Sequence, residues 1–160
     1  MKIKVITLWQ PWASAIILGY KQVETRGRNT NLRGPVAIHA AQKPTSKAKI
    51  FEFENLCKQL PFKMFAEDYH ALPFGQIIGQ VDIVGTARTQ FIKHHALTSL
   101  SDRIKNWPWE ELLGDYGFDR YGYLLENPIA YKNPIPAKGN QVLGWQYDLP
   151  DMETLMNNKI

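Results

Sequence analysis

The stretch GYKQVETRGR at residues 19–28 places a lysine, a glutamate and an arginine close together, directly after an apolar run. If a strand begins after Lys21, its two-residue period puts Glu24 and Arg26 on one face, and the flexible stem of Lys21 can curl over either face. One interpretation is a solvated hairpin edge, whose ion pairs contribute about 0–1 kcal/mol to stability. The other is the floor of a binding site, with donors for phosphate or base edges and one acid for proton transfer.

The residues around this stretch predict a small barrel. Residues 2–8 alternate like a strand, Pro11 suits the first position of a helix, and Gly19 suits its end. Trp12 is predicted to lie in the core, because it stands on a largely apolar helix. Glycines within the segment GQIIGQVDIVG suit the bends of a tightly coiled sheet. We predict an α+β fold, a barrel of five to six strands with helices packed around it, with strands at 3–8, 36–41, 76–89 and 142–147 and a helix at 11–18.

The other segments predict further helices and one domain. Residues 45–70 have a helical pattern that is interrupted at Pro61. Residues 93–119 predict an insertion with a short helix, either a lid or a patch on the open end of the barrel. We expect residues 1–150 to form a single domain and residues 151–160 a polar tail, mobile or loosely docked as a helix. The buried anchors of the first helical segment are expected to be Phe51, Leu56, Leu60, Phe65 and Tyr69.

The composition predicts a soluble, cytoplasmic and monomeric protein. Cys57 is the only cysteine, which excludes an internal disulfide and a thiolate metal cluster. His94 and His95 are adjacent and cannot share one face, so no metal site is expected, and no cofactor either. No apolar run reaches the ~20 residues that cross a bilayer, and we expect no membrane partner. A net charge of +4 and five tryptophans favour polyanionic partners with unpaired bases.

The segments LWQPWASAIILGYKQVETRGR and RGPVAIHAA resemble the ASCH domain family, which has a PUA-like barrel. The hallmark of the family is Gly-x-Lys-x-x-Glu-x-Arg, and Gly19, Lys21, Glu24 and Arg26 match every position. The later segments GQIIGQVDIVG, YLLENP and VLGWQY resemble the remaining barrel strands of the family. The resemblance covers most of the chain in order and is looser over residues 44–72 and 93–119.

The resemblance implies a role linked to nucleic acid, in a cleft that carries the hallmark. ASCH domains are related to RNA-binding PUA domains; some bacterial members cleave single-stranded RNA, and others remove the acetyl group from N4-acetylcytidine. In this second branch the catalytic set is a lysine, a threonine three residues later and a distal glutamate. Lys21 matches the lysine, but Glu24 stands at the threonine position. Glu110 and Glu111 are candidates for the distal glutamate.

We therefore predict a domain that binds single-stranded RNA or another nucleic acid, with cleavage of RNA as a further hypothesis. The alternative is an amidohydrolase that acts on a modified nucleoside. Lys21 and Glu24 are the catalytic candidates, as acid and base on a 2′-hydroxyl, and Glu24 is expected to orient Lys21. Lys21 and Arg26 are expected to hold phosphate.

Five further residues are candidates for ligand binding. Trp9, Gln10 and Ser14 lie at the junction between the first strand and the first helix, where N–H groups favour phosphate and an indole can stack on a base. His39 is flanked by alanines, whose small side chains leave room for a ligand or for an overlying helix. In the second case His39 is a structural histidine. Lys43, at the end of the same strand, can reach a phosphate or stay solvated.

Overall fold

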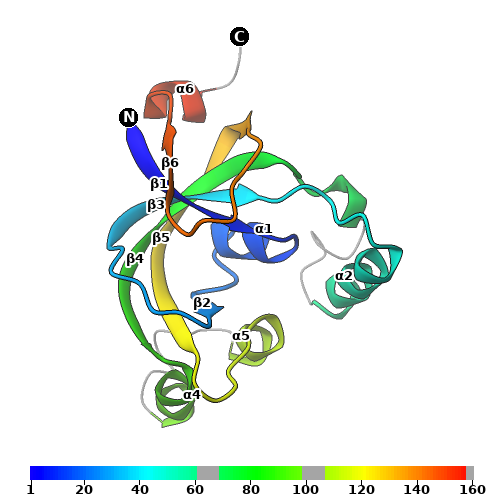
Figure 1. Cartoon of the computed structure of the whole chain (residues 1–160), viewed down its shortest axis with the longest axis vertical. Helices are drawn as coiled ribbons and strands as arrows, with labels where there is room; N and C mark the ends of the chain where they lie inside the picture. Colours follow the sequence, from blue (N-terminus) through cyan, green and yellow to red (C-terminus); the bar gives the residue numbers. More distant parts are fainter. Residues whose placement is uncertain (61–68, 99–106, 158–160) are drawn as a thin grey trace.

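The computed structural model describes residues 1–60, 69–98 and 107–157, and its six strands form one sheet in the order β2-β5-β4-β3-β1-β6. β1 and β3 are parallel, and the other neighbouring strands are antiparallel. The sheet curls into a half-barrel (Figure 1), so the predicted α+β barrel is confirmed. The strands are β1 Lys2–Leu8, β2 Val23–Arg26, β3 Gly34–Ala40, β4 Gln76–Arg88, β5 Tyr121–Pro136 and β6 Trp145–Asp148.

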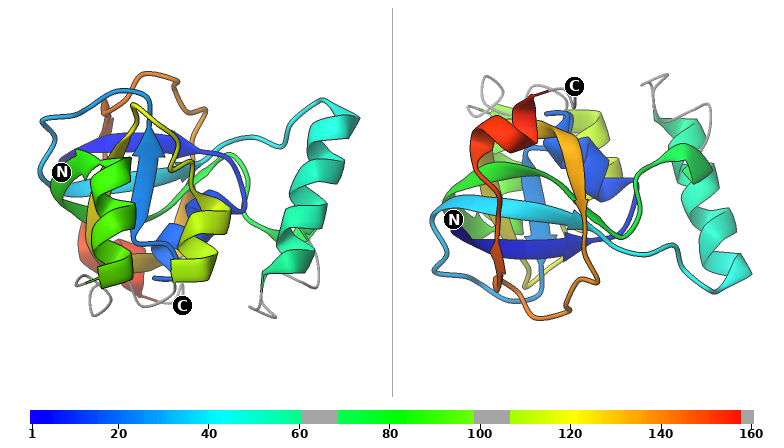
Figure 2. Two further views of the ribbon diagram at one scale, coloured as in Figure 1. Left: turned by 90° about the horizontal axis from the view of Figure 1, so that it is seen from below. Right: turned by 90° about the horizontal axis from the view of Figure 1, so that it is seen from above.

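The helices lie inside and around the curled sheet. The short helix α1 sits within the curve (Figure 1), while α2 stands to one side of the sheet, away from α4 and α5 (Figure 2). None of the described helices is long and apolar enough to span a membrane. The helices are α1 Trp12–Ile17, α2 Lys47–Gln59, α4 Thr89–Thr98, α5 Trp107–Leu113 and α6 Met152–Met156, with one 3₁₀ turn, η1, at Tyr69–Ala71.

The curl comes from β4 and β5, the two longest strands. Their pairing shifts register at three places in β4: between Ile77 and Gly79, between Gln80 and Asp82, and between Ile83 and Gly85. Each such irregularity leaves one or more extra residues unpaired on one strand, which bends that strand and increases its twist. The bent pair wraps around α1 and brings β2, which pairs with the far end of β5, opposite β1.

Two apolar clusters hold the sheet from its two faces. The inner cluster packs α1 against the sheet, and Ile16 is fully buried in it; burying a side chain of this size stabilises a fold by about 1.5–3 kcal/mol. The outer cluster joins Ile3 and Val5 of β1 to Leu155 of α6. The tail is thus docked over residues 152–156, and Asp151 caps α6 by accepting a hydrogen bond from Thr154 N at 2.7 Å.

Two predictions about the elements need correction. Phe51 was expected in the core but is 64% exposed, because the buried face of α2 is formed by Phe53 and Cys57, followed by Leu60. Phe65 lies outside the described residues. The last strand begins at Trp145, not at residue 142, because the segment before it forms a turn.

Candidate functional site

The main cavity has a volume of about 420 Å³ and lies where β1 ends, α1 begins and β2 and α5 come together. Two indoles, one carboxylate–guanidinium pair and the end of α5 form its wall. This composition combines apolar surface with a few convergent polar groups, which is typical of a ligand site. Its lining includes Trp9, Trp12, Glu24, Arg26, Leu113 and Asp115.

Glu24 and Arg26 lie in this cavity together, as the strand period predicts. The Nε atom of Arg26 donates a hydrogen bond to Glu24 Oε1 at 2.9 Å, and its Nη2 atom donates to the carbonyl oxygen of Thr7 at 3.2 Å. β2 and β1 are not neighbours in the sheet, so Arg26 joins two strands across the open side of the half-barrel. Glu24 is 7% exposed, and its remaining accessible surface belongs to the cavity.

The protonation of Glu24 is set by opposing effects. Burial raises the pKa of the Glu24 carboxyl above its ordinary value, and the positive charges of Lys21 and Arg26 lower it only in part. A carboxyl whose pKa is raised gives up its proton at a higher pH than an exposed one. Such a group is suited to accept and donate protons near a ligand.

Lys21 does not line the main cavity, and the expectation that it does so is wrong. Its side chain is completely buried and turns toward α5, where the Nζ atom lies 2.9 Å from Glu110 Oε1. The same nitrogen donates a hydrogen bond to the carbonyl oxygen of Val23. The ammonium group is thus neutralised beneath β2, and Glu24 pairs with Arg26 instead of orienting Lys21.

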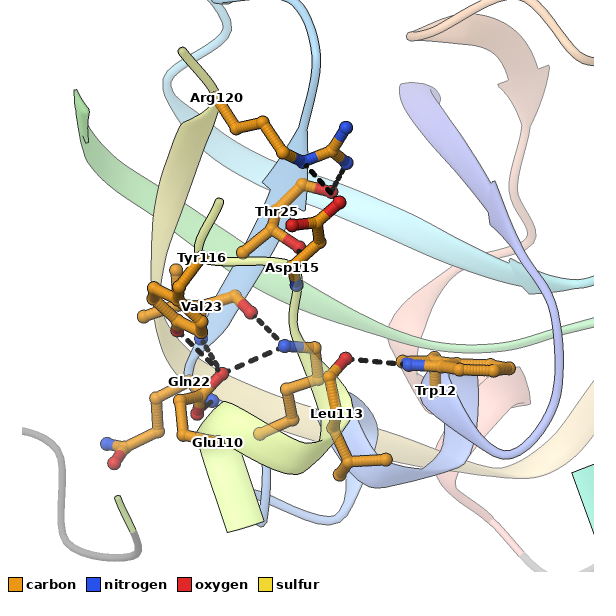
Figure 3. Close-up of polar contacts among 10 residues, drawn as sticks. Trp12, Gln22, Val23, Thr25, Glu110, Leu113, Asp115, Tyr116 and Arg120 are labelled. Carbon is orange, nitrogen blue, oxygen red and sulfur yellow. Dashed lines mark hydrogen bonds and ion pairs between the residues drawn. The ribbon is translucent and has the colours of Figure 1, made fainter. Parts of the chain in front are cut away.

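Glu110, one of the two candidates for the distal glutamate, is the ion-pair partner of Lys21. Its carboxylate accepts hydrogen bonds from the backbone N–H groups of Gln22 at 2.7 Å and Val23 at 3.2 Å, in addition to the Lys21 contact (Figure 3). Tyr116 adds a hydroxyl donor at 3.4 Å; burial, together with the charge of Glu110, raises the pKa of that phenol. The other candidate, Glu111, forms a surface pair with Lys93.

The end of α5 is fixed as a wall of the cavity. The indole N–H of Trp12 donates to the carbonyl oxygen of Leu113 at 2.7 Å, and Asp115 N donates to Thr25 Oγ1 at 2.9 Å (Figure 3). Arg120 Nε lies 3.2 Å from Asp115 Oδ2. Within the insertion predicted over residues 93–119, residues 112–115 therefore form one side of the site. Trp12, expected in the core, also lines the cavity.

Trp9 lies at the mouth of the site. It is 37% exposed, and its ring packs at a tilt against Phe53 of α2, with centroids 6.1 Å apart. The Nζ atom of Lys49 lies 5.4 Å from the centre of the Trp9 ring. A partly exposed indole beside a cation is suited to stack on a base, and the stacking role of Trp9 stays a prediction.

Gln10 and Ser14 are buried, bond to each other and do not line the main cavity. Gln10 is fully buried; its Nε2 atom donates to Ser14 Oγ at 2.7 Å and to the carbonyl oxygen of Pro73 at 2.8 Å. Ser14 N returns a hydrogen bond to Gln10 Oε1 at 3.0 Å. These bonds fix the start of α1 to the segment before β4, so the prediction that Gln10 and Ser14 contact a ligand is not supported.

His39 and Lys43 line a second cavity of about 270 Å³ beside the first. His39 Nε2 lies 2.9 Å from the carbonyl oxygen of Ala137; this nitrogen carries the proton, because a carbonyl can only accept. Burial lowers the pKa of the His39 imidazole, which favours the neutral ring. Lys43 Nζ lies 3.0 Å from His70 Nδ1 and 4.9 Å from the centre of the Phe74 ring.

The backbone at Gly139 presses directly against His39, which leads to a testable prediction. Gly139 has a φ of +75°, and a Cβ atom there would lie 2.2 Å from His39 Cε1. Gly34 has a φ of +80° but nothing within 4 Å of the corresponding Cβ position. Gly139→Ala should therefore destabilise the fold by more than the roughly 1 kcal/mol expected for an alanine at positive φ. Gly34→Ala should show that backbone cost alone. If chemical denaturation gives the two variants equal losses in the free energy of unfolding, the close approach of Gly139 to His39 is contradicted.

Comparison with known proteins places the chain in a family. The sequence model of the ASCH domain matches residues 6–134. Activating signal cointegrator 1 from Homo sapiens is 35% identical over 148 residues and the Mus musculus protein of that name 26% identical, each match covering 89% of this chain. The chain spans 22% of the length of these relatives.

Solved structures that match this chain include the crystal structure of ASCH from Zymomonas mobilis, which is 19% identical with a TM-score of 0.47. That match covers 94% of this chain and 89% of the other. A mutant of the same Zymomonas mobilis protein matches at 17% identity and a TM-score of 0.47, covering 96% of this chain and 94% of that one. Because the family's sequence model extends over most of the described strands and includes the Gly-x-Lys-x-x-Glu-x-Arg stretch, this chain belongs to the ASCH domain family.

Proposed function

We propose that the chain binds single-stranded RNA by taking one unpaired base into the main cavity. The observation that carries this proposal is the convergence of Trp9, Glu24 and Arg26 on one cavity of about 420 Å³. An indole is a stacking surface that accepts any base, while a carboxylate and a guanidinium offer an acceptor and donors to the edge of that base. Membership of a family related to RNA-binding domains, and the net charge of +4, agree with this ligand.

The roles within the hallmark differ in this proposal. Glu24 and Arg26 contact the ligand, with Arg26 also holding Glu24 in place. Lys21 acts indirectly: by binding Glu110 it joins the start of β2 to α5, and later residues of both elements line the cavity. If the domain also cleaves RNA, Glu24 is the group in position to accept a proton, and Lys21 is too deeply buried to donate one to the ligand.

Hydrolysis of a modified nucleoside is a second candidate function. The observation that favours it is the contact between Lys21 and a distal glutamate, Glu110, at 2.9 Å. Two observations oppose it: the position three residues after Lys21 is Glu24 and not a threonine, and Lys21 is sealed from the cavity. Incubation with N4-acetylcytidine, followed by chromatography for cytidine and acetate, distinguishes this activity from RNA binding.

Deleting the stacking surface tests the proposal. We expect Trp9→Ala to weaken binding of a single-stranded RNA octamer by about 1–3 kcal/mol, a loss of about 5- to 150-fold in affinity. Binding is measured by calorimetry, and quenching of tryptophan fluorescence by the octamer should fall in a Trp9→Phe variant. Phe118→Ala removes an aromatic ring that is 88% exposed and does not line the cavity, and it should bind like the wild type.

The opposite pattern would contradict the proposal. If Trp9→Ala binds the octamer normally while its melting temperature drops sharply, Trp9 serves the packing of α2 through Phe53 and not the ligand. If neither the wild type nor the Phe118→Ala variant binds RNA of any sequence, the domain is not an RNA-binding one.

A further inference from the structure

The two cavities adjoin at Trp9. Both are lined by Thr7 and Trp9, at the end of β1, and by Ala41 and Gln141 on the segments that follow β3 and precede β6. A ligand stacked on Trp9 in the first cavity is therefore at the entrance of the second. The two volumes, about 420 Å³ and about 270 Å³, form neighbouring compartments with Trp9 between them.

The charges of the two compartments differ in sign. The larger one is lined by Glu24 and Asp115 as well as by Arg26. Among the described residues, those that line the smaller one include two lysines, Lys43 and Lys138, and no aspartate or glutamate. A compartment with cations and no carboxylate favours an anion, whereas a compartment with both signs suits the donors and acceptors of a base edge.

Lys43 is held in position, and Lys138 is free to reach the same compartment. The ammonium of Lys43 lies over the Phe74 ring and donates to His70 Nδ1, while His70 Nε2 contacts Glu54 on α2. Lys138 is exposed, on the segment that follows β5, and no carboxylate lies within ion-pair distance of it in the part of the chain that the structure describes. One positioned and one flexible cation can hold a phosphate between them.

We infer that the smaller cavity is a phosphate subsite, so that the ligand of the domain is a phosphate-bearing nucleotide unit of an RNA strand and not a free nucleoside. This inference rests on the proposed function, since it takes the base of that unit to lie in the larger cavity. The base stacks on Trp9 beside Glu24 and Arg26, and the phosphate next to its ribose lies between Lys43 and Lys138. Whether that phosphate is the 5′ or the 3′ phosphate of the unit determines the direction in which the strand crosses the end of β1.

Calorimetry with matched ligands tests the inference. The ligands are the four ribonucleosides, their 5′- and 3′-monophosphates and a mixed-sequence RNA octamer. We expect either the 5′- or the 3′-monophosphates to bind at least about tenfold more tightly than the nucleosides at low salt. The reason is that a phosphate accepts charge-assisted hydrogen bonds from the lysines. Lys43→Met and Lys138→Met should each remove most of this gain and leave nucleoside affinity unchanged.

The octamer distinguishes the phosphodiester of a strand from the phosphate of a free nucleotide. For a strand, each lysine variant should reduce the slope of log K against log salt by about 0.7, the value for one phosphate contact on single-stranded nucleic acid. Lys2→Met is the matched control: it removes the same charge from an exposed residue at the opposite end of β1 and should change neither quantity. Loss of the monophosphate gain without a change in the octamer slope would assign the subsite to free nucleotides.

Two results would overturn the inference, and they are distinguishable. If nucleosides and monophosphates bind equally and both lysine variants behave like Lys2→Met, there is no phosphate subsite, although the base site can stand. If the octamer and all small ligands fail to bind, the proposed function itself is wrong, and the phosphate subsite falls with it.

Discussion

Replacing Lys21 with methionine is expected to lower the free energy of unfolding by about 3–5 kcal/mol, because it leaves the buried carboxylate of Glu110 without its counter-charge. A domain of this size is stable by roughly 5–15 kcal/mol, so the loss takes a large fraction of the total. It corresponds to a drop of about 6–20 °C in melting temperature. Calorimetric melting and urea denaturation measure it directly.

The pair and its surroundings provide two controls. Lys93→Met breaks the surface pair with Glu111, whose side chains are each 45% exposed, and should cost at most about 1 kcal/mol. Combining Lys21→Met with Glu110→Gln removes both buried charges and keeps one acceptor oxygen for the N–H groups of Gln22 and Val23, so the double variant should recover part of the loss. If Lys21→Met melts like the wild type, Lys21 is solvated, and the interpretation of this stretch as a solvated hairpin edge is correct.

The sequence predicted those parts of the molecule that depend on local pattern. The alternation over residues 2–8 and the glycine-rich segment beginning at residue 75 identified β1 and β4, because side chains along a strand must alternate between two faces. The same period placed Glu24 and Arg26 together, and both lie in the main cavity. The order of the strands in the sheet was not predicted, because such local patterns leave it open.

The parts that could not be predicted depend on long-range partners. Lys21 is buried against Glu110, which lies 89 residues later, in one of the two segments where the resemblance to the family is looser. Gln10 has the side chain of a binding residue, but its amide is used by Ser14 and by the carbonyl oxygen of Pro73, 63 residues away. Polar residue type indicates that a partner exists, and only the fold decides whether that partner is protein or ligand.

Glu24→Gln is expected to have the opposite effect to Lys21→Met: a large loss of RNA affinity without a loss of stability. A charged acceptor contributes about 1.5–3 kcal/mol to a hydrogen bond, so the neutral amide should weaken octamer binding by about 10- to 150-fold. The amide oxygen can still accept the Arg26 hydrogen bond, so β2 should stay joined to β1. Glu126→Gln, a matched change at an exposed position of β5, should leave affinity unchanged.

The pH dependence of stability follows from the raised pKa of Glu24, and its sign can be worked out. Because burial raises the pKa of this carboxyl in the folded state above the unfolded value near 4.5, the folded chain binds the proton more tightly than the unfolded chain. The free energy of unfolding should then fall as pH rises from the unfolded pKa through the folded pKa. The Glu24→Gln variant lacks this titration, so its stability should decline less over that interval and equal or exceed that of the wild type at neutral pH. If Glu24→Gln instead lowers the melting temperature at neutral pH as much as Lys21→Met does, the Glu24 carboxylate is a structural partner of Arg26. The ligand must then contact other residues of the cavity.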